Sequence, residues 1–395
     1  MKKMSKCFAC FFFFAAGLCY GQVNNPNQFK KHILTSDFIS EGVAVGDVNR
    51  DGKLDILAGS CWFEAPGWKR HDIAPFKNYN PGKDYSTSFL DCCMDVNLDG
   101  WLDLVVIGFP GTEAMWYENP KGKEGYWKSH LVIKGVGIGD ESPRYVDVNG
   151  DGRIDILCAD IATKQMVWLS PPLAKGDTTW TRYPISAANI PGTDRFSHGL
   201  GFGDVNKDGR SDVIIKSGWW EAPVDRRQPN WVFHAADLGD DCSEMYVLDV
   251  NGDGLNDVIS ASAHKYGIWW HEQVKDAAGN VSWIQHDINK LFSESHGVAL
   301  TDINNDGYPD IITGKRWFAH NDTATDPGAH EPAVLYWFEF TPGKAPYFIP
   351  HQIDDDSGVG LHIVVQDINQ DKRKDIVVAN KKGVFWFENI INNKR

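Results

Sequence analysis

The sequence lacks the features that mark nucleic-acid-binding and nucleotide-dependent proteins. It has no excess of positive charge: 39 lysines and arginines stand against 53 aspartates and glutamates, for a formal net charge of −14. This balance disfavours nucleic acid and anionic membrane surfaces as partners. The phosphate-cradling glycine motif, the dinucleotide fingerprint, the G-x-S-x-G elbow and clustered CxxC pairs are all missing. The common signatures of nucleotide-dependent enzymes and serine hydrolases are therefore absent.

Long hydrophobic runs are also missing, except at the N-terminus. There, three lysines precede an apolar run over residues 8–18, and Gly21 offers a cleavage point. This run is too short to span a bilayer comfortably, and no later stretch could cross one. We interpret residues 1–21 as a signal peptide and predict a periplasmic or secreted protein. Lipid anchoring is disfavoured, because residues 16–19 match a lipoprotein signal poorly.

Cysteine is scarce once the signal peptide is removed. Three of the eight cysteines lie in that peptide, which leaves Cys61, Cys92, Cys93, Cys158 and Cys242. An odd number without framework spacing predicts small buried strand residues, although an oxidising compartment would permit a disulfide among them.

One acidic motif, by contrast, is abundant. The pattern D-x-N-x-D-G-x-x-D occurs seven times, with lysine in place of glycine in the last copy, and successive copies start 48, 52, 57, 45, 53 and 65 residues apart. Self-similarity at this period predicts stacked supersecondary units, commonly propeller blades. The copies span residues 47–55, 95–103, 147–155, 204–212, 249–257, 302–310 and 367–375.

The segments around each copy predict four short strands and no helix. A small-residue strand leads into the acidic loop, a β-branched strand follows it, and an aromatic strand comes next, such as 62–64, 219–221 or, in the sixth repeat, 317–318. An outer strand then carries an aromatic-x-x-His pattern. Four strands with polar turns make one blade of a β-propeller.

The two ends of the chain predict how the ring closes. The seventh repeat stops after three strands, and residues 29–34 repeat the outer-strand pattern. Pairing this N-terminal strand with the last blade would remove an exposed edge. The predicted fold is therefore all-β, with one seven-bladed propeller domain over residues 22–395.

Histidines recur in the predicted outer strands. Because they follow the blade repeat, with Tyr183 in the corresponding place of the third blade, we interpret them as structural. They are His32, His71, His130, His234, His286 and His351.

The acidic loops provide oxygen-only ligands, which suit a hard cation and chiefly calcium. They hold 21 of the 53 acidic residues, and seven divalent ions would bring the charge of the processed chain from −17 (−14 less three signal lysines) to about −3. The alternative is a set of plain Asx turns. In the seventh loop Lys372 replaces glycine and Lys374 adds positive charge, so we predict the weakest site there. The predicted ligands are Asp47, Asn49, Asp51, Asp55, Asp95, Asn97, Asp99, Asp103, Asp147, Asn149, Asp151, Asp155, Asp204, Asn206, Asp208, Asp212, Asp249, Asn251, Asp253, Asp257, Asp302, Asn304, Asp306, Asp310, Asp367, Asn369, Asp371 and Asp375.

These seven loops, each following a small-residue strand, resemble FG-GAP or VCBS repeats over about residues 29–390. The resemblance implies a calcium-stabilised propeller but leaves function open, because this fold hosts adhesion modules, lectins and lyases. The W-[WFY]-E-x-P signature at 62–66 and 219–223 also resembles the propeller portion of aldos-2-ulose dehydratase. That family eliminates water from oxidised sugars with metal assistance, but its cupin-like portion is absent here.

Ionisable residues that differ between blades are predicted to gather on the face opposite the acidic loops. This face receives the entry to each first strand and the turn between the second and third strands. Imidazoles beside carboxylates suit zinc or another transition metal, or acid–base chemistry on a sugar with a cation stabilising an oxyanion. The alternative is that they cap strands or contact water. The candidates are Glu41, Glu141, His198, Lys216, Glu244, His264, His296, Arg316 and His362.

Three functions are consistent with these residues. The first is a lyase or dehydratase that performs β-elimination on a sugar or oxidised sugar. The second is a non-catalytic propeller that binds glycan or a protein partner. The third is a glycoside hydrolase in which Glu141 and Glu244 form the acid–base pair.

Overall fold

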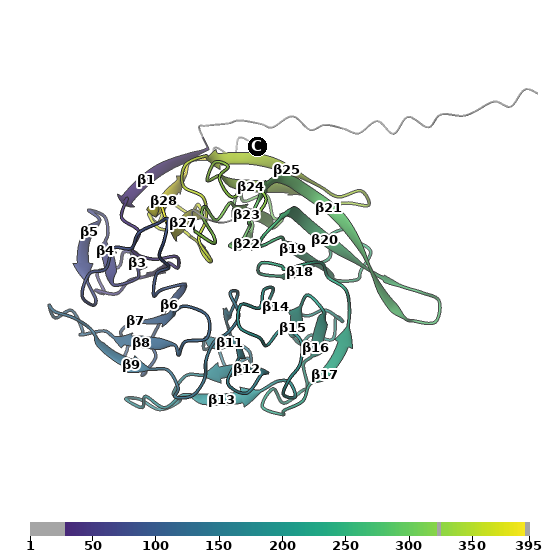
Figure 1. Ribbon diagram of the computed structural model, residues 1–395, viewed down its shortest axis with the longest axis horizontal. Coiled ribbons are helices and arrows are strands. Elements are labelled where there is room, and N and C mark those ends of the chain that lie inside the picture. The colour runs from purple at the N-terminus through teal and green to yellow at the C-terminus, as the bar shows by residue number, and fades with distance from the viewer. Residues whose placement is uncertain (1–27, 322–324, 392–395) are drawn as a thin grey trace, which may run out of the picture.

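Seven antiparallel sheets of four strands form a ring in the computed structural model (Figure 1), which describes residues 28–321 and 325–391. This arrangement confirms the predicted seven-bladed propeller. The predicted signal peptide lies outside the described residues. Within the described ranges, no helix has the length and apolar character needed to cross a membrane.

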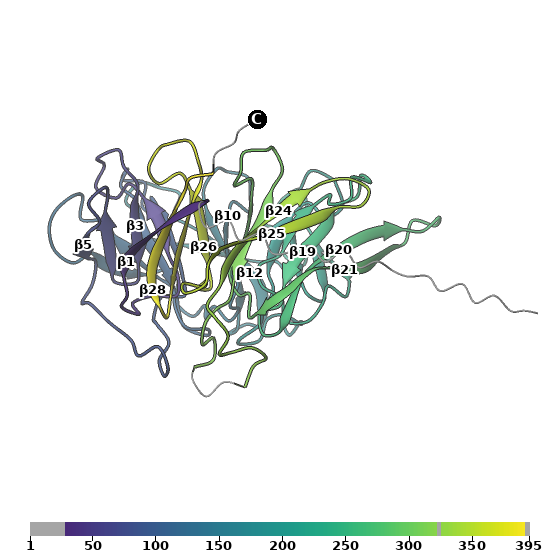
Figure 2. The same cartoon turned by 90° about the horizontal axis from the view of Figure 1, so that it is seen from above.

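Each blade is a meander whose first strand lies nearest the axis of the ring (Figure 1), and Figure 2 shows the same ring turned by 90° and seen from its side. Blades 1 to 4 comprise β2 (Ala44–Gly46), β3 (Asp55–Ala58), β4 (Cys61–Glu64) and β5 (Lys69–Asp72); β6 (Leu90–Met94), β7 (Asp103–Ile107), β8 (Met115–Glu118) and β9 (Lys128–Leu131); β10 (Arg144–Val146), β11 (Asp155–Asp160), β12 (Gln165–Ser170) and β13 (Thr181–Pro184); and β14 (Gly201–Gly203), β15 (Asp212–Ile215), β16 (Gly218–Glu221) and β17 (Val232–Ala235). Blades 5 to 7 comprise β18 (Tyr246–Leu248), β19 (Asp257–Ala261), β20 (Tyr266–Lys275) and β21 (Val281–Ser293); β22 (Val298–Thr301), β23 (Asp310–Gly314), β24 (Leu335–Thr341) and β25 (Tyr347–Asp354); and β26 (Ile363–Gln366), β27 (Asp375–Asn380), β28 (Gly383–Asn389) and β1 (Phe29–Thr35).

The small residues of the first strands allow neighbouring blades to approach each other near the axis. Gly201 of β14 forms a parallel bridge with Met245, and a Cβ on Gly201 would lie 2.7 Å from the Met245 carbonyl oxygen. The second strands are fully buried and β-branched, and the core fills the space between adjacent sheets. Trp116 of β8, for example, is completely buried in a cluster with residues of blade 3. The ring is therefore held by sheet-on-sheet packing of apolar side chains.

The N-terminal strand closes the ring as predicted. β1 pairs antiparallel with β28, with His32 opposite Trp386 and Phe29 opposite Asn389. Blade 7 thereby obtains its fourth strand from the other end of the chain, and the edge of β28 is covered.

The prediction for the third strand of blade 6 is wrong. Trp317 and Phe318 lie in the long loop after β23 and stack on each other, with ring centroids 3.9 Å apart. The third strand is β24, where Trp337 pairs with Ile312. Phe318 has a φ of 52°, which a β-strand does not accommodate. An aromatic pair soon after the second strand imitated the repeat, and the inserted loop displaced the true strand.

The outer histidines have the structural role that the repeat predicts. Each ring stacks on the tryptophan of the third strand at a centroid distance of 4.1–4.3 Å, and each Nε2 lies 2.8–2.9 Å from a glutamate of that strand. In blade 3, Tyr183 stacks on Trp168 at 4.2 Å, and Ser170 occupies the glutamate position. The six pairs are His32–Glu388, His71–Glu64, His130–Glu118, His234–Glu221, His286–Glu272 and His351–Glu339.

The cysteines after the predicted signal peptide are all free thiols. Cys61, Cys158 and Cys242 are buried, whereas Cys92 and Cys93 are partly buried. The structure agrees with the prediction of small strand residues, and the alternative of a disulfide among them is not realised.

Candidate functional site

The acidic loops all join the first and second strands, and their polar side chains organise the turn. In every loop the first aspartate accepts an N–H bond from the sixth residue, and the asparagine Oδ1 accepts one from the fifth residue. The ninth-position aspartate is completely buried and accepts the N–H of the second residue. The motif therefore holds the turn even through protein groups alone.

The ninth aspartate also joins the loop to the end of the third strand. In six blades its Oδ1 accepts a backbone N–H there, as from Ala222 to Asp212 at 2.8 Å. In blade 3 the corresponding residue is Pro171, which has no N–H, and Oδ1 of Asp155 is buried without a partner. The repeat is thus chemically incomplete in one blade.

The donor set of the loops fits a hard divalent cation. Burial raises the pKa of each ninth-position aspartate to about 6 or about 7, and neighbouring loop carboxylates add to the shift. A cation would offset this repulsion. The backbone N–H bonds that the loop carboxylates accept keep these carboxylates apart. Among the described residues, two groups of His, Cys, Asp or Glu side chains bring three ligand atoms within 4.8 Å of one another, and both groups lie outside the acidic loops. Calcium would therefore need the asparagine and backbone oxygens as well.

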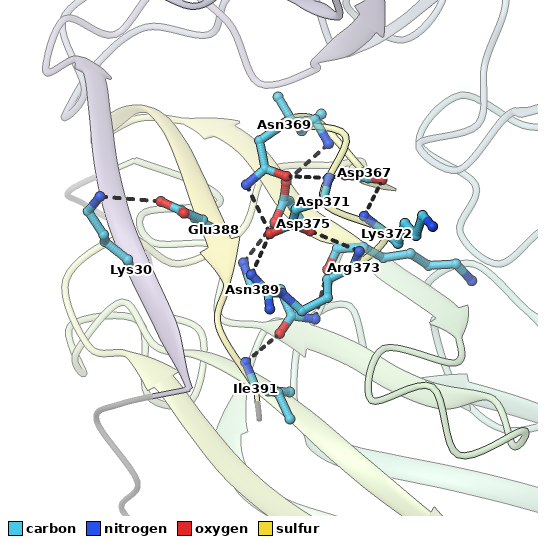
Figure 3. Close-up of polar contacts among 12 residues, drawn as sticks. Lys30, Asp367, Asn369, Asp371, Lys372, Arg373, Asp375, Glu388, Asn389 and Ile391 are labelled. Carbon is cyan, nitrogen blue, oxygen red and sulfur yellow. Dashed lines mark hydrogen bonds and ion pairs between the residues drawn. The ribbon is translucent and has the colours of Figure 1, made fainter. Parts of the chain in front are cut away.

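The seventh loop keeps the geometry of the others despite its different sequence (Figure 3). Lys372 has a φ of 71°, and its N–H bonds Asp367 Oδ2 at 2.8 Å, as the glycines do in the other loops. The Arg373 guanidinium pairs with Asp371, one of the predicted ligands. Arg210 pairs with Asp208 in the same way in the fourth loop, so the feature that sets the seventh loop apart is the positive φ at a sixth residue with a Cβ. The weakest calcium affinity of this loop stays a prediction.

The opposite face brings together six of the nine predicted rim residues: five form what we name the imidazole cluster, and the sixth, Glu41, pairs with Arg316. The cluster comprises Glu141, His198, His264, His296 and Arg316. Three enter from segments just before first strands. His264 lies between β19 and β20, and Arg316 follows β23. The blade topology places all of these segments at the end of the sheets away from the acidic loops.

The three imidazoles converge through their ring nitrogens. His264 Nε2 lies 3.2 Å from His198 Nε2, and one ligand atom from each of the three histidines lies within 4.8 Å of the others. The Nδ1 of His198 is 2.8 Å from the carbonyl oxygen of Phe196, which assigns the N–H to Nδ1 and leaves a lone pair on Nε2. His296 Nε2 is buried without a partner. This arrangement is a nitrogen-rich site of the kind that binds a transition metal.

The charges around the imidazoles are balanced by buried ion pairs. Arg316 bonds Glu41 at 2.5 Å and Glu141 at 3.3 Å. Burial opposes ionisation of Glu141, but His198 and Arg316 lower the pKa of its carboxyl to about 2. Burial and the neighbouring imidazoles lower the pKa of His264 to about 4, and burial and the Arg316 guanidinium lower that of His296 well below its usual value. The cluster thus holds two neutral imidazoles next to an ionised carboxylate at neutral pH.

Two predicted residues lie in different surroundings from the cluster. His362 and Glu244 line a cavity of about 70 Å³ together with Arg144 and Tyr246. Burial lowers the pKa of His362 to about 4 and raises that of Glu244 to about 7. Both precede their acidic loop by five residues, whereas Glu41, Glu141, His198 and His296 precede theirs by six. A one-residue offset accounts for the different placement.

The remaining predicted residue lies at the exposed edge of the cluster. Lys216 Nζ is 2.6 Å from Asp241 Oδ1, and the other carboxylate oxygen is 3.9 Å from His264 Nδ1. Both Lys216 and Asp241 side chains are almost half exposed.

Sequence reasoning missed several residues of this face. Glu294, His320 and Asp326 place one ligand atom each within 4.8 Å of one another, beside the imidazole cluster. Glu294 stands two residues before His296 and could have been noticed from that proximity. Asp326 lies in the inserted loop of blade 6, where no repeat position predicts it.

The comparisons with known proteins support the fold and the repeat. The model of the FG-GAP-like repeat matches residues 95–158, 147–215 and 249–313. A solved structure of BBS1N in complex with ARL6DN is similar, with a TM-score of 0.52 and 8% identity, covering 94% of this chain and 97% of that one. No curated protein matches the sequence.

Two further solved structures resemble the chain more distantly. An Agrocybe aegerita lectin that recognises non-reducing terminal N-acetylglucosamine has a TM-score of 0.45 and 16% identity, over 84% of this chain and 81% of the lectin. The V. cholerae biofilm matrix protein Bap1 has a TM-score of 0.44 and 11% identity, over 93% and 92%. Together with the seven acidic loops and the closed ring, the repeat match shows that the chain is a seven-bladed β-propeller that contains FG-GAP-like repeats.

Proposed function

We propose that the imidazole cluster is the active site of a carbon–oxygen lyase that acts on a sugar or oxidised sugar. The observation that carries this proposal is the convergence of His198, His264 and His296 next to an ionised glutamate. Three imidazole donors suit zinc or a similar divalent metal, and Glu141 Oε2 lies 3.6 Å from His198 Nε2 and 3.9 Å from His296 Nε2, where it would place a negative charge next to the ion.

The reaction we assign is β-elimination next to a carbonyl group. The bond between the α-carbon and its proton breaks, its electron pair forms the new C=C bond, and the β-carbon–oxygen bond breaks so that the oxygen leaves as water after protonation. A bound divalent metal would polarise the carbonyl oxygen. Asp241 is the exposed, ionised carboxylate at the edge of the cluster and accepts the proton, while Lys216 stabilises the developing oxyanion.

The same face offers groups that suit a carbohydrate acid. Phe196 is 43% exposed, and the Arg195 guanidinium lies 4.8 Å from its ring centroid and 5.2 Å from that of Phe109. An aromatic face next to a guanidinium can contact the apolar face of a sugar ring and pair with a carboxylate. These groups support a uronate or another oxidised sugar as substrate.

The acidic loops complete the proposal as structural calcium sites on the other face. Burial is the main cause of the raised pKa values of the ninth aspartates, and repulsion from the neighbouring loop carboxylates adds to it. Calcium would stabilise the turns between the first and second strands and so hold the blade that presents each rim residue.

The test is an elimination assay with a panel of uronate-containing and keto sugars, followed by the ultraviolet absorbance of a new conjugated double bond. We expect turnover by the native protein and its loss in His264→Ala. His330→Ala is the matched control, because His330 lies in the loop on this face but outside the cluster. Binding of a panel sugar without product would replace the lyase with a binding module, and equal loss in both variants would reject the cluster as the active site.

A further inference from the structure

A second group of ligand atoms lies beside the imidazole cluster. Glu294, His320 and Asp326 each place one such atom within 4.8 Å of the other two. The His320 ring centroid is 4.8 Å from that of His264 and 6.4 Å from that of His296. We propose that these three residues bind a second divalent metal ion, so that this face holds a two-metal centre. The inference rests on the proposed metal-dependent function of the imidazole cluster.

The glutamate supplies the independent observation. Glu294 is completely buried, and only one of its carboxylate oxygens has a partner: Lys315 Nζ lies 2.6 Å from Oε2. Oε1 is buried without any hydrogen-bond donor. Leaving a buried carboxylate oxygen without a hydrogen-bond donor is energetically unfavourable. A cation held between Glu294, His320 and Asp326 would supply the missing partner.

The other two ligands are held together and can be reached from solvent. His320 Nδ1 and Asp326 Oδ2 are in direct contact, and their side chains are 37% and 24% exposed. The site therefore combines a buried anchor with an accessible pair of ligands, which gives a metal ion a path of entry. One imidazole with two carboxylates favours manganese, iron(II) or zinc over calcium.

The chain connects the two metal groups through a single short segment. His296 Nδ1 lies 3.4 Å from the backbone carbonyl oxygen of Glu294, while the Glu294 side chain belongs to the second group. Two adjacent divalent ions can hold both oxygens of a reacting substrate, whereas one ion holds only one. For an elimination, these would be the carbonyl oxygen and the leaving oxygen.

The experiment is manganese binding by the full chain, followed by electron paramagnetic resonance and equilibrium dialysis with calcium in excess to occupy the acidic loops. We expect two manganese ions per chain in the native protein. Asp326→Asn should bind one ion, or bind the second roughly tenfold more weakly or worse. Glu294→Gln should also lose or weaken the second ion. Because Glu294 is buried, this substitution could impair folding, whereas Asp326→Asn changes a residue in a surface loop and keeps the test valid in that case. His330→Ala should still bind two.

The outcomes separate this inference from the proposed function. One ion that is lost in His264→Ala but retained in Asp326→Asn and Glu294→Gln would overturn the second site and leave the first in place. One ion that is lost in Asp326→Asn but retained in His264→Ala would support the second site and overturn the metal in the imidazole cluster. No manganese bound in the presence of calcium would overturn both.

Discussion

The pairing of an outer histidine with a glutamate is expected to contribute measurable stability in each blade that contains it. Blade 2 provides the test, because Trp116 is completely buried, His130 stacks on it at 4.2 Å, and Glu118 Oε2 lies 2.9 Å from His130 Nε2. His130→Phe keeps the stacked ring but removes the bond. Glu118→Ser introduces the residue type that blade 3 has at Ser170. The double variant carries both changes.

The expected size of the effect follows from burial. A hydrogen bond to a charged group contributes about 1.5–3 kcal/mol, and partial exposure reduces this toward about 1 kcal/mol. The side chains of His130 and Glu118 are 16% and 29% exposed, so we expect each single variant to lose about 1 kcal/mol. Glu118→Ser also removes the contact with Asn97 Nδ2 at 3.4 Å. The double variant should lose about 1 kcal/mol less stability than the sum of the losses of the two single variants.

The measurement is urea unfolding of the four proteins at one calcium concentration and one pH, because bound metal and protons change apparent stability. The control is Tyr183→Phe at the corresponding position of blade 3. This variant keeps an aromatic ring on Trp168 in a blade that has no histidine–glutamate pair, so it should change stability much less. Strictly additive losses in blade 2 would show that the histidine and the glutamate do not act together, and would refute the structural interpretation of the repeated histidines.

Three further predictions concern single residues. Burial raises the pKa of Glu244 from 4.5 to about 7, so this group should lower the free energy of unfolding by about 3 kcal/mol as the pH rises from roughly 4.5 to 7. Urea unfolding at about pH 8 should therefore find Glu244→Gln more stable than the native protein, and a less stable variant at that pH would contradict this. Lys372→Gly should remove the strain of a positive φ at a residue with a Cβ and so raise the affinity of the weakest calcium site in a calorimetric titration. An unchanged affinity of that site would count against this prediction. Ala222→Pro should remove the N–H that bonds Asp212 at 2.8 Å and lower stability by about 2 kcal/mol in thermal unfolding, whereas native stability would show that this bond is dispensable.

The blade pattern was readable from the sequence because it depends on local chemistry repeated seven times. Each acidic loop needs its own aspartates to accept its own N–H groups, so the motif marks the turn wherever it occurs. The strand at 29–34 was also predictable, since it repeats the outer pattern and the last blade lacks a fourth strand. The exception was blade 6, where Trp317 and Phe318 imitated a strand inside an inserted loop.

The composition of the imidazole cluster was only partly readable. The sequence placed the candidates on one face, but a side chain that stands one residue earlier or later enters different surroundings. His362 and Glu244 therefore face the cavity with Arg144, although they resemble the cluster residues in type. Glu294 and Asp326 follow no repeat at all.

The sequence by itself determined the number of blades, the closure of the ring and the face that each ionisable residue occupies, because these follow from short-range periodicity. Only the tertiary structure decided which imidazoles meet, that Arg316 joins two glutamates from different blades, and that one oxygen of Glu294 is buried without a partner. Contacts across the axis join residues more than a hundred positions apart, and their distances depend on the packing of whole sheets rather than on any local pattern.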